Sequence, residues 1–124
     1  MYTILIVDDD PSIRQATQAP LELLAGWKTL LAGSGREGLA LAQEKQPDAI
    51  LLDVLMPEMD GIMTLKHLQS LPATQSIPVI LFTSQPSRVI HQTFAGLPIT
   101  GIIHKPFDVT ELIQQIRTFL NWDE

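Results

Sequence analysis

Four short, mostly apolar runs are spread over the whole chain, and each is followed by polar residues of the types found in catalytic and binding sites. The runs are 4–7, 49–52, 79–82 and 101–104, and the residues after them include Asp8, Asp9, Asp53, Thr83 and Lys105. Continuous apolar runs of this length are typical of strands buried on both faces of a parallel sheet. The carboxyl ends of parallel strands meet at one edge of the sheet, where such folds bind ligands. We therefore expect these polar side chains to form one site.

Amphipathic segments separate the apolar runs, which is the pattern of repeated strand–helix units around a parallel sheet. We expect strands at 3–7, 28–32, 48–52, 78–82 and 101–104, and helices at 11–25, 35–45, 60–71, 87–95 and 108–121. At 124 residues the chain is long enough for one ordinary hydrophobic core. The predicted fold class is α/β, with a single domain over residues 1–124.

Aspartates mark the starts of three predicted helices. Asp10, Asp60 and Asp108 each stand where a side chain can accept a hydrogen bond from the first helical turn. After Asp108, an apolar stripe at helical spacing is formed by Val109, Leu112, Ile113, Ile116 and Leu120. Pro20 falls inside the first predicted helix, where it removes one backbone hydrogen bond and predicts a kink.

Composition and charge exclude several classes of protein. The formal net charge is -6 and the eight basic residues are scattered, which argues against direct binding to nucleic acid or to an anionic membrane. The chain has no cysteine, so disulfides and thiolate metal sites are excluded. Neither an export signal nor an apolar stretch of ~20 residues is present, and we expect a cytoplasmic protein.

The aspartates at the strand ends need a positive partner. Two like charges 4 Å apart repel by about 4 kcal/mol at an effective dielectric constant of 20. Mg²⁺ fits this need because it prefers oxygen ligands and is commonly held by one or two carboxylates and a phosphoryl oxygen. Lys105 supplies a second, fixed positive charge.

A metal, a lysine and a hydroxyl around a carboxylate are the groups that phosphoryl transfer requires. Asp53 stands alone after the most apolar run, and a carboxylate can itself be the nucleophile, so it is the candidate phosphoacceptor. Asp8 and Asp9 are then the candidate metal ligands. Thr83 and Lys105 are placed to bind phosphoryl oxygens.

These motifs together resemble the receiver domains of response regulators in two-component signalling, of the chemotaxis-regulator type. The resemblance covers essentially the whole chain and rests on Asp8-Asp9-Asp10-Pro11, the segment from Asp53 to Asp60-Gly61, Thr83-Ser84 and Lys105-Pro106-Phe107. The intervals from Asp9 to Asp53, from Asp53 to Thr83 and from Thr83 to Lys105 are 44, 30 and 22 residues, as expected of a regular member. The resemblance implies a flavodoxin-like, doubly wound parallel sheet of five strands in the order 2-1-3-4-5.

The resemblance also implies roles for individual residues. Asp53 matches the phosphoacceptor, Asp8 and Asp9 match the Mg²⁺ ligands together with Asp53, and the backbone carbonyl of Leu55 matches a main-chain metal ligand. Thr83 matches the switch hydroxyl, and Lys105-Pro106 matches a cis peptide bond. The position that commonly holds an aromatic switch residue is Ile102, so coupling from the site to the surface depends on Thr83 and the loop that follows.

The implied function is a phosphorylation-controlled switch and not an enzyme with a separate substrate. A sensor histidine kinase or histidine phosphotransfer protein is the implied phosphodonor, and the domain itself supplies the chemistry of self-phosphorylation and autodephosphorylation. The residues identify no output protein or fused output domain, and they leave open a dimer formed on phosphorylation. A haloacid-dehalogenase-like phosphatase is the enzyme alternative, but it requires an acidic residue at the position of Leu55. A phosphorylation-independent pseudo-receiver scaffold is the third reading.

Overall fold

A five-stranded parallel sheet covered by helices on both faces forms the protein. The computed structural model describes residues 1–56 and 60–122. Strands and helices alternate as β1 (Thr3–Val7), α1 (Pro11–Leu23), β2 (Lys28–Ala32), α2 (Gly35–Lys45), β3 (Ala49–Asp53), α3 (Gly61–Ser70), β4 (Val79–Thr83), α4 (Ser87–Thr93), β5 (Gly101–His104) and α5 (Val109–Leu120). The predicted elements are all present, and their bounds agree with the predicted ones to within a few residues.

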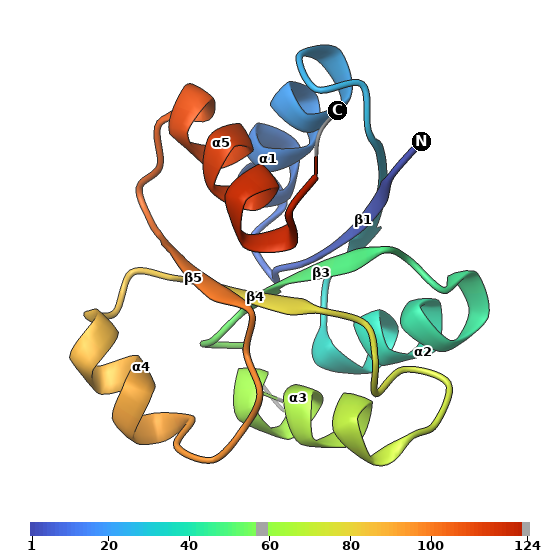
Figure 1. Ribbon diagram of the computed structural model, residues 1–124, viewed down its shortest axis with the longest axis vertical. Coiled ribbons are helices and arrows are strands. Elements are labelled where there is room, and N and C mark those ends of the chain that lie inside the picture. The colour runs from blue at the N-terminus through green and yellow to red at the C-terminus, as the bar shows by residue number, and fades with distance from the viewer. Residues whose placement is uncertain (57–59, 123–124) are drawn as a thin grey trace.

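The strand order in the sheet is β2-β1-β3-β4-β5, which confirms the predicted doubly wound topology. Helices α1 and α5 cover one face, and α2, α3 and α4 cover the other (Figure 1). Val7 pairs with Leu52 and Leu52 pairs with Leu81. The carboxyl ends of β1, β3 and β4 are therefore level with one another, and the residues that follow them meet at one edge of the sheet.

Every residue of β3 and β4 is buried, because helices pack on both faces of these central strands. Alternate side chains enter two separate layers of the core. Val7, Leu52 and Leu81 lie in the layer with α2, α3 and α4, whereas Ile6, Leu51 and Phe82 lie in the layer with α1 and α5. Full burial of one large aliphatic side chain contributes about 1.5–3 kcal/mol, so these layers hold the sheet edge rigidly in place.

The three predicted aspartate caps are confirmed. The Asp10 side chain accepts a hydrogen bond from Ser12 N–H, and Asp60 accepts one from Met63 N–H. Asp108 accepts from both Thr110 and Glu111 N–H groups. These caps start α1, α3 and α5 directly after the strand ends, so each helix begins at the edge of the sheet where the polar residues gather.

One detail differs from the sequence-based expectations. Val109 is 38% exposed because it is the first residue of α5, and the buried stripe begins one turn later at Leu112. Helix α1 continues past the buried Pro20 to Leu23, and the Leu24 N–H donates to the Pro20 carbonyl at 2.9 Å. Helix α4 is short, and Gly96 and Pro98 lie in the segment that follows it. Among the described helices, each is too short or too polar to cross a bilayer.

Candidate functional site

Three carboxylates meet at the carboxyl edge of the sheet. Asp8 and Asp9 follow β1, Asp53 is the last residue of β3, and one oxygen atom from each lies within 4.8 Å of the others. Asp8 is 1% exposed and Asp53 is 6% exposed, whereas Asp9 is open to solvent. The structure thus brings together three of the side chains that the strand-end pattern predicts to be neighbours.

Asp8 is held by several hydrogen bonds. Its Oδ2 accepts from Lys105 Nζ at 2.7 Å and its Oδ1 accepts from Asp10 N–H at 3.0 Å. Its own N–H donates to the Ala32 carbonyl at 3.0 Å. Because these partners come from β2, the β1–α1 loop and the end of β5, the Asp8 carboxylate has a single well-defined position.

Asp53 occupies an environment that disfavours its charge. Burial, and after it the negative charge of Asp8, together raise the pKa of Asp53 from 3.8 to about 6. The Lys105 ammonium and the Leu55 N–H act in the opposite direction, since both stabilise the carboxylate. A cation placed among the aspartates would relieve the remaining repulsion.

Lys105 pairs with both buried aspartates. Its Nζ lies 2.7 Å from Asp8 Oδ2 and 3.3 Å from Asp53 Oδ1. The same ammonium stands 5.0 Å from the centroid of the Phe82 ring, at a distance typical of a cation–π contact. The Lys105–Pro106 peptide bond is cis, as the resemblance implies. One lysine against three carboxylates leaves the site with an excess of negative charge.

Thr83 ends β4 beside this cluster and is 2% exposed. Its Oγ1 accepts a hydrogen bond from Gln85 N–H at 3.0 Å, and its carbonyl accepts one from Lys105 N–H at 2.8 Å. The Thr83 hydroxyl is therefore tied to the loop that leads into α4. A movement of this side chain would also move the start of α4.

Ile102 and Leu55, the two other residues singled out by the sequence, have contrasting surroundings. Ile102 is partly buried and packs in the core layer that contains Ile90 of α4 and Phe94, the residue that follows this helix. Leu55 follows Asp53 closely and its side chain is 61% exposed. Pro57, which belongs to the same motif, lies outside the described residues.

Two contacts near the site were not predicted from the sequence. Arg14 Nη1 donates to the backbone carbonyl of Asp8 at 2.7 Å. Ser87 Oγ, in the first turn of α4, lies 2.9 Å from His104 Nε2. His104 is the last residue of β5 and is exposed. No sequence motif indicates either contact: Arg14 reaches back to a backbone carbonyl, which every residue type has, and Ser87 and His104 come from separate elements.

The carboxylate cluster has the chemistry of a site for a hard divalent cation. Asp8, Asp9 and Asp53 offer oxygen ligands at mutual distances that a single ion can span. Asp8 and Asp53 are buried and carry one shared lysine, so a divalent cation would balance charge that Lys105 leaves uncompensated. The donor set therefore fits Mg²⁺ better than a soft metal, since the chain has no cysteine.

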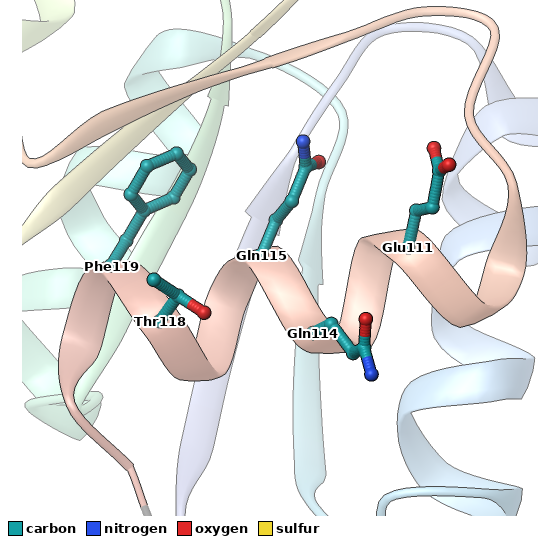
Figure 2. Close-up of a pocket in the computed structure, with 5 residues that line it drawn as sticks. All are labelled: Glu111, Gln114, Gln115, Thr118 and Phe119. Atoms are coloured by element: carbon teal, nitrogen blue, oxygen red, sulfur yellow. The ribbon is translucent and has the colours of Figure 1, made fainter.

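A hollow of about 490 Å³ lies elsewhere, on the outer side of α5. In Figure 2, Glu111, Gln115 and Phe119 point to one side of α5 and Gln114 points away from them. The Phe119 ring packs close to Gly101, where an added Cβ would lie 2.6 Å from it. None of the carboxylates at the sheet edge lines this hollow, so it is separate from the candidate site.

Comparison with known proteins agrees with this geometry. The family model for the response regulator receiver domain matches residues 4–117. The DNA-binding dual master transcriptional regulator RpaA of Synechocystis sp. is 36% identical over 122 residues, which cover 97% of this chain and 49% of that protein. The chain spans about half the length of the curated relatives it matches.

Solved structures show the same fold. Chemotaxis protein CheY4 of Vibrio cholerae superposes with a TM-score of 0.89 at 33% identity, covering 96% of this chain and 98% of that chain. The receiver domain of the sensor histidine kinase PA1611 from Pseudomonas aeruginosa, with a magnesium ion in its active site cleft, superposes with a TM-score of 0.87 at 23% identity, covering 97% of this chain and 98% of that chain. The family model matches nearly the whole chain, and solved receiver structures have the same fold: the chain belongs to the response regulator receiver domains of two-component signalling.

Proposed function

We propose that Asp53 is the phosphoacceptor of this receiver domain and that Asp8, Asp9, Asp53 and the Leu55 carbonyl hold Mg²⁺. One observation carries the proposal: three carboxylates within 4.8 Å share a single lysine that contacts Asp8 and Asp53. Asp53 is a buried member at the end of the central strand, and burial, together with the Asp8 charge, raises its pKa, so a bound cation would stabilise its ionised form. Support for Mg²⁺ also comes from the magnesium ion named for the PA1611 receiver domain.

The phosphodonor is a phosphohistidine on a sensor histidine kinase or a histidine phosphotransfer protein. An Asp53 oxygen attacks the phosphorus atom, the P–N bond breaks, and its electron pair returns to the imidazole nitrogen, which takes a proton from solvent. Asp53 then carries the phosphoryl group as an acyl phosphate. Bound Mg²⁺ supplies positive charge beside the phosphoryl oxygens.

Lys105 and Thr83 complete the site around the transferred group. The Lys105 ammonium already points at Asp53 Oδ1, so it is placed to pair with a phosphoryl oxygen. The Thr83 hydroxyl oxygen accepts from the Gln85 N–H, and its own O–H would donate to a phosphoryl oxygen; a movement of Thr83 toward that group would change the start of α4. Ile102 packs in the core layer that contains Ile90 of α4, so its core contacts would transmit the movement of α4. This differs from a receiver in which an aromatic side chain at this position turns inward. A phosphoryl group adds about -1.5 to -2 charges and so biases the surface formed by β4 and α4.

The test is labelling by a small acyl phosphate donor in the presence of Mg²⁺, followed by intact mass. Wild-type protein should gain one phosphoryl group, and Asp53→Asn should gain none. Glu44→Gln removes an exposed carboxylate on α2 and serves as the matched control, which should label like wild type. Equal labelling of Asp53→Asn would refute the assignment. Removal of the divalent cation with a chelator should abolish labelling, since the carboxylates would otherwise repel the donor.

A further inference from the structure

We propose that Arg14 is a positioning residue for the metal site: its guanidinium orients the peptide bond between Asp8 and Asp9. This inference rests on the proposed function, because it concerns the residues that hold Mg²⁺ there. Arg14 lies in α1 and is partly buried. Its side chain returns to the loop before the helix, and Nη1 donates to the Asp8 carbonyl at 2.7 Å. Such a short distance is typical of a charge-assisted hydrogen bond.

The Arg14 contact completes the set of bonds that holds Asp8. The Asp8 N–H donates to Ala32, and its two carboxylate oxygens accept from Asp10 N–H and Lys105 Nζ. The Asp8 carbonyl is the remaining polar group, and Arg14 is its donor. This carbonyl belongs to the peptide bond that leads into Asp9. Without Arg14, that peptide could rotate, and Asp9 would lose its fixed orientation relative to Asp8.

Gly33 leaves the space that the guanidinium occupies. A Cβ at Gly33 would lie 3.2 Å from Arg14 Nη1 and 3.7 Å from Cζ, so the guanidinium packs against the Gly33 main chain. The Gly33 N–H in turn donates to Glu37 Oε1 at 2.8 Å. Arg14 therefore joins the loop after β1 to the loop after β2. A lysine could supply charge here, but it has no planar group to lie against Gly33.

The direction in which Mg²⁺ affinity changes when Arg14 is removed distinguishes a positioning role from a purely electrostatic one. Arg14 is a cation near a site for a cation, so its charge alone weakens Mg²⁺ binding, and its removal would then tighten binding. If Arg14 positions the aspartates, its removal weakens binding instead. Residues that orient metal ligands typically change metal affinity by about 10- to 100-fold when they are replaced.

The first experiment is calorimetric titration of Mg²⁺ into wild type, Arg14→Ala and Arg14→Lys. We expect about 10-fold weaker binding for Arg14→Ala and an intermediate loss for Arg14→Lys. Arg36→Ala removes an exposed arginine from the first turn of α2 and serves as the control for lost charge. It should bind Mg²⁺ nearly as wild type does. Unchanged or tighter Mg²⁺ binding by Arg14→Ala would overturn the proposal.

Gly33 provides a second test through its contact with Arg14. Gly33→Ala should weaken Mg²⁺ binding in the wild-type background, because the new Cβ would lie 3.2 Å from Arg14 Nη1 and the guanidinium would have to shift by a few tenths of an ångström. It should have no further effect in the Arg14→Ala background, where nothing is left to displace. Fully additive losses would contradict the proposal. In the metal-free proteins, the Asp9 amide signal in NMR spectra should shift on Arg14→Ala and not on Arg36→Ala, which reports the peptide orientation directly.

Labelling by the acyl phosphate donor distinguishes the two proposals. Arg14→Ala should require more Mg²⁺ for half-maximal labelling but reach the wild-type rate when Mg²⁺ is saturating. If wild type is labelled at Asp53 and Arg14→Ala has the same Mg²⁺ requirement, only the role of Arg14 fails. If wild type is not labelled at any Mg²⁺ concentration, the proposed function fails. Urea unfolding of each variant shows that the folded state is populated in these measurements.

Discussion

The raised pKa of Asp53 makes a prediction about stability that requires no phosphodonor. The carboxyl pKa is about 6 in the folded protein, against 3.8 for the ordinary group. A raised carboxyl pKa means that the ionised form is disfavoured by folding, so wild type loses stability as the pH rises from about 4 to about 7. The shift corresponds to about 3 kcal/mol once Asp53 is fully ionised. Asp53→Asn removes this cost because its side chain carries no charge.

We therefore expect Asp53→Asn to be more stable than wild type by up to about 3 kcal/mol at pH 8 in a metal-free buffer, and by about half as much at pH 5. Urea unfolding followed by tryptophan emission measures the difference, since Trp27 is buried and becomes exposed on unfolding. With a slope of about 2 kcal/mol/M, the midpoints should differ by about 1.5 M urea at pH 8.

Added Mg²⁺ should reduce the difference at pH 8, because a bound cation stabilises the ionised wild type and not the amide variant. Glu44→Gln provides the control for loss of a carboxylate that is exposed. It should unfold like wild type at each pH. A stability gain for Asp53→Asn that is the same at pH 5 and pH 8, or a loss at pH 8, would refute the reasoning.

Three further predictions follow from the structure. Asp108→Ala should destabilise the protein by about 1 kcal/mol in urea unfolding, because it removes the side chain that caps Thr110 and Glu111 N–H; no change would show that the cap is not used in solution. Gly61→Ala should lower both the melting temperature and the Mg²⁺ affinity, since the new Cβ would lie 2.8 Å from the Asp53 carbonyl oxygen and from Val54 Cα; an unchanged affinity would show that the strain does not reach the site. Ser87→Ala should change the Nε2 signal of His104 in NMR spectra while costing less than about 1 kcal/mol, because the Ser87–His104 contact is exposed; an unaltered signal would contradict the contact.

The strand-end pattern predicted the fold and the neighbours in the site for one reason. Strands buried on both faces leave continuous apolar runs, and the first polar residue after each run must emerge at the sheet edge. Asp8, Asp53 and Lys105 meet in space because each follows such a run. Helix caps were predictable in the same way, since Asp10 and Asp108 interact with residues only two or three positions away.

The contacts that the long Arg14 side chain makes were not predictable. Arg14 donates to a backbone carbonyl, and every residue type has one, so the sequence does not indicate which residue is the partner. The space at Gly33 is visible only when α1 is placed beside the loop after β2. The 38% exposure of Val109 has a similar origin, because helical spacing specifies the face of a residue and not whether the core extends to its end of the helix.

The aromatic rings near the two ends of the chain make the domain suitable for insertion into another protein. Tyr2 and Trp122 stack with ring centroids 3.8 Å apart, and Trp27 meets Trp122 edge-on at 5.1 Å. Both ends lie on the same side of the molecule (Figure 1). A host protein could therefore carry residues 2–122 within one surface loop, because the entry and exit points are already adjacent. In such a chimera, a host motion that moves Tyr2 away from Trp122 would pull on the amino-terminal end of β1. That end lies at the edge of the sheet opposite the carboxylates.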